Sequence, residues 1–157
     1  MARELIGGGL VLAVLLLALY IYQSVRRRRA AQEAVLPDLD SRLISEKLFE
    51  CLYVATVYAN NPLERIWAYG LGGRGRAHVG SASGYLVINR IGERDLAIPL
   101  ASIERLYRGG ATIDRGVEKS GLVQIQWRHG QHSLLTSLRI TTDQEQNYLK
   151  LKEVVDA

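Results

Sequence analysis

Residues 122–140 read Leu-Val-Gln-Ile-Gln-Trp-Arg-His-Gly-Gln-His-Ser-Leu-Leu-Thr-Ser-Leu-Arg-Ile. In residues 123–127 every second residue is apolar, a period of two that predicts a strand with one buried face and one solvated face. Alternation of the same kind marks residues 134–140. A glycine lies between the two runs, so the stretch predicts an antiparallel β-hairpin with its turn at residues 128–131. The tryptophan lies on the apolar face and is expected in the core.

Further short strands precede the hairpin. Each is bounded by turn-forming residues such as Asn, Gly, Pro or Ser. They are predicted at residues 52–58, 76–80, 85–89, 96–99, 103–107 and 112–117. After the hairpin, apolar residues recur at helical spacing from Tyr148 to Val155, and Thr142-Asp143-Gln144-Glu145 matches a capping box, which marks a helix start. Residues 48–157 are therefore predicted to form a mainly-β domain of about seven antiparallel strands with a C-terminal α-helix.

The charge of the 157-residue chain is concentrated at one place. Its formal net charge is +4. Residues 1–29 hold five arginines against a single glutamate, whereas residues 30–157 hold equal numbers of basic and acidic residues. Because the basicity lies beside one apolar segment and not on the domain, nucleic-acid binding is not expected.

That apolar segment, Leu5–Tyr22, contains no charged residue. As a helix rising about 1.5 Å per residue it would be about 27 Å long, close to the hydrocarbon thickness of a bilayer. A transmembrane helix is therefore predicted at residues 5–25, after a short tail of residues 1–4. A cleaved signal peptide is the alternative. It is disfavoured because the apolar run is long and ends in arginines, without an Ala-x-Ala cleavage site.

Arg26, Arg27, Arg28 and Arg29 directly follow the apolar segment. Arginines beside a membrane span stay on the cytoplasmic side, so the N-terminus is expected outside and the C-terminal domain in the cytoplasm, at the plasma membrane. The same arginines are suited to contact anionic lipid headgroups. Residues 26–47 are predicted as a polybasic juxtamembrane segment and linker.

Several motifs of the chain together resemble those of a family of actinobacterial single-pass membrane proteins. They are Tyr53-Val54-Ala55-Thr56, Leu63-Glu64-Arg65-Ile66, Gly70-Leu71-Gly72 with Gly75-Arg76-Ala77, Arg94-Asp95-Leu96-Ala97-Ile98-Pro99 and Leu122-Val123-Gln124-Ile125-Gln126-Trp127. Members of that family carry a cytoplasmic pleckstrin-homology-like (PH-like) domain. They are often labelled export or membrane protein or transporter, and their genes commonly lie near those of pyrimidine biosynthesis. The resemblance implies a PH-like bent antiparallel sandwich or barrel closed by the C-terminal helix. It implies no agreed activity, and a single transmembrane helix encloses no transport pathway.

Three features that often carry chemistry lack the context that chemistry needs. Gly70-Leu71-Gly72-Gly73-Arg74-Gly75 matches Gly-x-Gly-x-x-Gly, but the dinucleotide fingerprint requires a helix after the glycines, and a strand is predicted there. Cys51 is the only cysteine, and no motif supplies it with a base. The three histidines have no further ligands at metal-binding spacing. No enzymatic activity, cofactor or metal is therefore expected.

Binding is the function that remains. The resemblance implies that Arg74 and Arg76 lie near the position where PH-like domains hold phosphorylated headgroups, and Trp67 is a residue of the type that anchors protein partners. With Arg26–Arg29, these are the candidate lipid- or partner-binding residues. We expect a scaffold or accessory protein at the inner membrane face that binds an unidentified cytoplasmic or membrane protein. Recognition of anionic lipid by the domain is the first alternative, and a small membrane-bound enzyme is the second.

Overall fold

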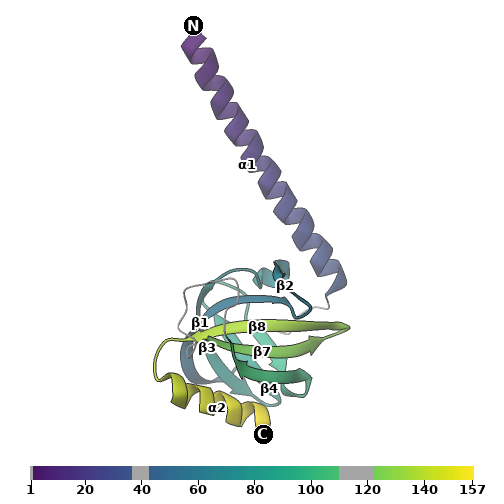
Figure 1. Cartoon of the computed structure of the whole chain (residues 1–157), viewed down its shortest axis with the longest axis vertical. Helices are drawn as coiled ribbons and strands as arrows, with labels where there is room; N and C mark the ends of the chain where they lie inside the picture. The colour runs from purple at the N-terminus through teal and green to yellow at the C-terminus, as the bar shows by residue number, and fades with distance from the viewer. Residues whose placement is uncertain (1, 37–42, 110–121) are drawn as a thin grey trace.

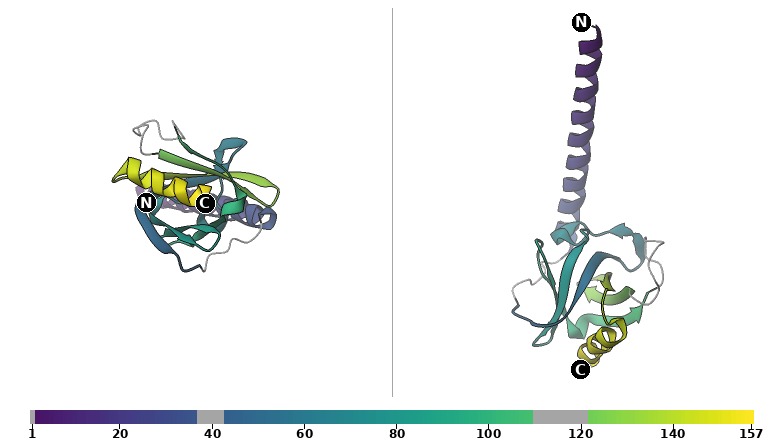
Figure 2. Two further views of the ribbon diagram at one scale, coloured as in Figure 1. Left: turned by 90° about the horizontal axis from the view of Figure 1, so that it is seen from below. Right: turned by 90° about the vertical axis from the view of Figure 1, so that its left-hand side faces the viewer.

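The computed structural model describes residues 2–36, 43–109 and 122–157. A long N-terminal helix is followed by a β-domain that ends in a second helix (Figure 1). The elements are α1 (Ala2–Val35), β1 (Glu46–Tyr58), β2 (Asn61–Arg65), the 3-10 helix η1 (Ala68–Gly70), β3 (Gly75–Ala82), β4 (Tyr85–Arg90), β5 (Leu96–Pro99), the 3-10 helix η2 (Leu100–Ser102), β6 (Ile103–Arg108), β7 (Leu122–His129), β8 (His132–Ile140) and α2 (Gln144–Asp156). Figures 1 and 2 show α1 leaving the domain at the end opposite α2.

The described strands form one antiparallel sheet in the order β5-β4-β3-β1-β8-β7-β6, and β2 pairs with β1 outside this path. The long strand β1 connects the two halves of the sheet. Its residues 46–53 pair with β3, and its residues 51–58 pair with β8. The register shifts within β1 in both pairings, and such bulges bend a strand and increase its twist. A PH-like sandwich requires such a bend in the strand that its two halves share.

The core lies between the two halves of the bent sheet. It is built from the inward-facing residues of the alternating strands, and α2 contributes Leu151 to it. Trp127, the largest of these side chains, is fully buried, which confirms the expectation from the sequence. The physical reason is the alternation from Val123 to Trp127, because a one-residue shift of the register would move Val123, Ile125 and Trp127 to the other face of the sheet.

The predicted hairpin is confirmed, with a shorter turn than expected. His129 pairs with His132, which leaves Gly130 and Gln131 as a two-residue turn. Gly130 has φ +59, a conformation that glycine adopts without strain. The strands predicted from residue 52 to residue 107 are also present, at β1 and β3 to β6. The strand predicted at 112–117 lies outside the described residues.

Two sequence predictions need correction. Among the described residues, the strand β2 lies where only a turn was expected around Asn61 and Pro62. The capping box is also wrong. The N-cap of α2 is Asp143 and not Thr142, and Asp143 is in the left-handed region (φ +44) with no side-chain hydrogen bond to the helix. The Thr142 carbonyl instead accepts a hydrogen bond of 2.9 Å from the side chain of Asn147.

Candidate functional site

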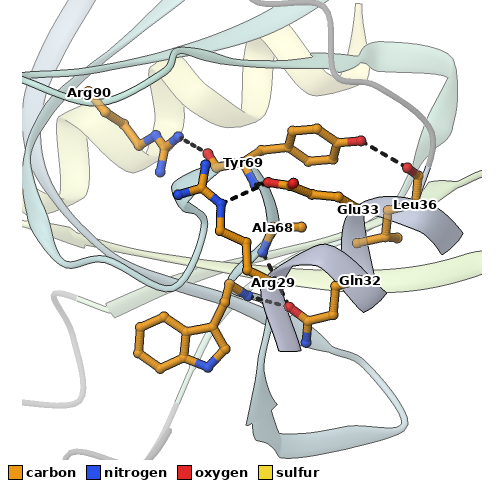
Figure 3. A network of polar contacts seen from close by, with 8 residues as sticks. Arg29, Gln32, Glu33, Leu36, Ala68, Tyr69 and Arg90 are labelled. Carbon is orange, nitrogen blue, oxygen red and sulfur yellow. Dashed lines mark hydrogen bonds and ion pairs between the residues drawn. The ribbon is translucent and has the colours of Figure 1, made fainter. Parts of the chain in front are cut away.

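The most elaborate polar site is the junction where α1 meets η1, shown in Figure 3. Gln32, near the end of α1, makes three of the hydrogen bonds of this junction. Its Oε1 atom accepts hydrogen bonds from the backbone N–H groups of Trp67 (2.6 Å) and Ala68 (3.2 Å). Its Nε2 atom donates to the carbonyl of Arg65 at 3.2 Å. One side chain of the helix therefore satisfies three backbone groups of the segment between β2 and η1.

The next residue of α1 extends the junction. Glu33 Oε1 accepts hydrogen bonds from the backbone N–H of Tyr69 (3.4 Å) and from Arg29 Nε (2.8 Å), and the bond from Arg29 holds the pKa of Glu33 below its usual range. The Tyr69 hydroxyl donates to the carbonyl of Leu36 at 3.0 Å. The Leu36 side chain is buried and belongs to the domain core. The helix end is thus packed and hydrogen-bonded to the domain, and α1 continues without a break past the boundary expected at residue 26.

Arg90, at the end of β4, fixes the other side of η1. It is 5% exposed. Its guanidinium donates to the carbonyls of Gly70 (2.8 Å), Tyr69 (3.1 Å) and Arg94 (2.7 Å). It also lies over the Tyr53 ring, 5.0 Å from the ring centre. Because Tyr69 has φ +54, a strained conformation for a non-glycine residue, these bonds stabilise a backbone path that it would not prefer alone.

The glycines of residues 70–75 serve packing and turning. Gly70 has φ +71. A Cβ atom added to Gly72 would lie 2.8 Å from Cε3 of Trp67, so the indole lies directly against this glycine. The strand β3 begins at Gly75, where a dinucleotide site would need a helix. Because Gly72 has no side chain, the Trp67 indole can pack directly against the backbone there.

A groove of about 820 Å³ opens between α1 and the β1–β2 hairpin. Its lining residues come from both elements and from the segment before η1; they are Arg28, Ala31, Gln32, Asn61, Leu63, Glu64, Arg65 and Trp67. Leu63 is 82% exposed and Trp67 is 38% exposed. The structure therefore joins two of the candidate residues, Arg28 and Trp67, in one groove.

The other candidate residues are distributed differently. Arg26 and Arg27 are exposed on α1, and Arg29 pairs with Glu33 outside the groove that Arg28 lines. Arg74 and Arg76 are exposed, in the loop before β3 and on that strand. All of them are accessible to a ligand.

The residues considered above for thiol or metal chemistry take part in packing. Cys51 is buried, and burial raises the pKa of its thiol to about 12. His129 and His132 lie against the rings of Trp127 and Tyr58 respectively. Within residues 2–36, 43–109 and 122–157, no three His, Cys, Asp or Glu side chains converge in an arrangement that would hold a metal.

Sequence reasoning missed Gln32, Glu33 and Arg90, the residues that build the junction. Their partners are mostly backbone atoms far away in the sequence, and a backbone carbonyl or amide has no sequence signature. The only signal in the sequence was Arg90 itself, which directly follows a mostly apolar predicted strand. Arginine is rarely buried unless its donors are satisfied.

A bent antiparallel sheet with a shared central strand, closed by a C-terminal helix and joined to an apolar N-terminal helix, defines a small β-sheet domain of the PH-like type. The model of the family described as Bacterial PH domain-like matches residues 34–155, and the chain belongs to this family. PH-like domains are generally non-catalytic binding modules. The comparison with curated proteins found no match. The part of α1 from Gly7 to Val35 is long and apolar enough to cross a membrane, with a mean hydropathy of 2.0 in its most apolar window.

Gln32→Ala is expected to loosen the junction without unfolding the domain. The substitution removes the hydrogen-bond partner of the Trp67 and Ala68 amides, and their hydrogen exchange should become about fivefold faster, since a typical hydrogen bond contributes about 1 kcal/mol. Exchange is measured by NMR on the full chain in detergent micelles. Gln23→Ala, on the exposed surface of the same helix, is the control. Equal exchange in both variants would show that Gln32 does not hold η1.

Proposed function

We propose that this is a single-pass membrane protein with its N-terminus outside and its PH-like domain in the cytoplasm, where the domain binds another protein as a scaffold or accessory subunit. The observation that carries the proposal is the docking of the apolar helix onto η1 through Gln32 and Glu33. The domain is thereby held in one orientation relative to α1, with α2 at the end away from it (Figure 2). A fixed orientation is useful to a module that presents a surface to a partner.

The anchoring part of the proposal rests on the composition of α1. Its residues 5–22 carry no charge, Tyr20 and Tyr22 end the apolar run as interfacial aromatic residues often do, and four arginines follow. The side chains of residues 7–22 are all exposed to the surroundings of the helix. An exposed apolar helix of this length is stable only in a hydrophobic environment.

The strand β6 is the surface that we propose for the protein partner. Among the described strands it pairs with β7 alone, so no described strand covers its other edge, where a partner's strand would be added. Glu104 and Arg105 are exposed there, and charges of this kind prevent an edge from pairing with copies of itself. Glu104 is held in place by Arg128 (2.8 Å) and Ser133 (3.0 Å). The edge therefore offers backbone groups beside charges of fixed position.

Proximity labelling in living cells tests the proposal, with the labelling enzyme fused after Ala157. The full chain should enrich one or two cytoplasmic proteins over a bare anchor of residues 1–37. Arg105→Glu should reduce this enrichment at least tenfold. Lys152→Glu makes the same charge change on the exposed face of α2 and should leave it unchanged.

Three other results would each contradict part of the proposal. Labels found only on exported proteins would show that the orientation is reversed. The same labels with the full chain and the bare anchor would remove the protein-binding role. Equal loss with Arg105→Glu and Lys152→Glu would show that β6 is not the contact surface.

A further inference from the structure

We propose that the domain makes a second contact with the membrane, in which Leu63 lies against the headgroups of an anionic bilayer beside the arginines of α1. The inference rests on the membrane-spanning role of α1 proposed above. It goes beyond that role because the contact belongs to the β1–β2 hairpin and the segment after it, and not to the spanning helix.

The depth of the groove in the membrane follows from the length of the helix. The apolar run ends at Tyr22, and Arg28 lies six residues later, about 9 Å further along the helix axis. The headgroup layer on each side of a bilayer is about 5–8 Å thick. Arg28 therefore lies at the outer limit of the headgroups. Because Leu63 lines the same groove as Arg28, the tip of the hairpin reaches the membrane surface.

The exposure of the groove residues fits a lipid environment. Leu63 is 82% exposed, although a leucine side chain is apolar throughout. Trp67 is 38% exposed and presents its indole beside the same groove. The Trp67 amide is bonded to Gln32, about 15 Å beyond Tyr22 along the helix, so Trp67 lines the groove at a level further from the membrane than Arg28. Leu63, at the level of Arg28, is the apolar side chain of the groove that an edge of headgroups suits.

The charges near the groove fit an anionic surface. Arg28 and Arg65 line it together with one acid, Glu64, which accepts a hydrogen bond of 3.2 Å from Asn61. Arg26 and Arg27 lie just before this level on the helix, nearer the membrane. The region is positive overall, and each basic residue near an anionic bilayer adds to the attraction. A bilayer that contains anionic lipid is thus the occupant that both the apolar and the charged side chains favour.

Site-specific labelling of the full chain in lipid nanodiscs tests the contact. Leu63→Cys carries an environment-sensitive thiol dye. Leu149→Cys, an exposed leucine on α2 at the far end of the domain, is the matched control. The native Cys51 does not interfere, because it is buried and its pKa is raised to about 12, and the unsubstituted chain measures any residual labelling.

The dye at position 63 should emit at shorter wavelength in nanodiscs with phosphatidylserine than the dye at position 149. Nitroxide-labelled lipids should quench it at least threefold more strongly. Arg28→Gln added to Leu63→Cys should reduce the part of the quenching that depends on phosphatidylserine. Failure of the chain to enter nanodiscs at all would instead refute the membrane anchor on which the inference rests.

Two results would overturn the inference while leaving the anchor intact. Equal quenching at positions 63 and 149 in loaded nanodiscs would show that the hairpin stays in water. A dye at position 63 that is exposed in nanodiscs but protected in cells would show that a protein, and not the bilayer, covers the groove.

Discussion

Arg90→Met is expected to lower the free energy of unfolding by about 3–5 kcal/mol, because it breaks a buried network of three hydrogen bonds. Methionine replaces the aliphatic part of the arginine but none of its donors. The carbonyls of Tyr69, Gly70 and Arg94 would then lose partners at 2.7–3.1 Å in a region where the arginine is 5% exposed. Each buried carbonyl left without a partner costs about 1–3 kcal/mol. Water entering the space would recover part of this cost.

Urea unfolding of the full chain in detergent micelles, followed by near-ultraviolet circular dichroism, measures the effect. Arg76→Met is the control, because Arg76 is an exposed arginine on the neighbouring strand β3. It should change the free energy of unfolding by less than about 0.5 kcal/mol. The variant at position 90 should also accelerate hydrogen exchange at Trp67 and Ala68, because η1 then loses its hydrogen bonds on the side of β4. If the two methionine variants unfold alike, Arg90 is not what holds η1.

The sheet was predictable where burial on one face imposes alternation. β7 and β8 alternate because one side faces the core, and β5 was predicted with the bounds that the structure has, 96–99. β2 was missed because four of its five residues are exposed, so no apolar alternation marks it, and Pro62 indicated a turn. The helix α2 was expected from its apolar spacing, but its start was not, because the left-handed conformation of Asp143 depends on the chain that precedes it.

The site was less predictable than the fold. Arg28 was identified as an arginine beside a membrane span, and Trp67 as an aromatic residue of the type that anchors protein partners. Gln32 and Glu33 were read as part of a linker, since a polar stretch after a membrane helix has no pattern of its own. Their function appears only when η1 turns its backbone N–H groups toward them. Tertiary structure decides where these backbone N–H groups point, and they can be satisfied by a side chain of suitable length that carries an acceptor oxygen.

A buried chain of hydrogen bonds crosses the domain toward the loop that follows η1. Trp127 Nε1 donates to Thr136 Oγ1 (2.9 Å), the hydroxyls of Thr136 and Thr56 are 2.9 Å apart, and that of Tyr53 lies 2.7 Å from Thr56. The chain ends where Tyr53 donates to the carbonyl of Leu71 at 2.8 Å. An indole N–H only donates and a carbonyl only accepts, so each hydroxyl must donate in the direction of Leu71.

Thr136→Val is expected to lower the free energy of unfolding by about 2–3 kcal/mol, although valine has nearly the same shape. Valine leaves the indole N–H of Trp127 without an acceptor and Thr56 without a donor in a fully buried place. The loss reaches Tyr53 as well, because hydrogen bonds in a chain strengthen one another. Burial raises the pKa of Tyr53, which keeps its hydroxyl protonated and able to donate throughout the neutral range.

Thr136→Ser separates the hydrogen bond from packing. Serine keeps the hydroxyl and loses one buried methyl group, which costs about 1 kcal/mol. The same urea unfolding assay should therefore rank serine above valine in stability, the reverse of the order expected if apolar packing alone determined it. Valine at least as stable as serine would show that the chain of hydroxyls does not stabilise the domain. The ranking matters for the junction because Leu71 follows η1 directly, so the chain that begins at Trp127 on β7 helps to hold the segment on which α1 docks.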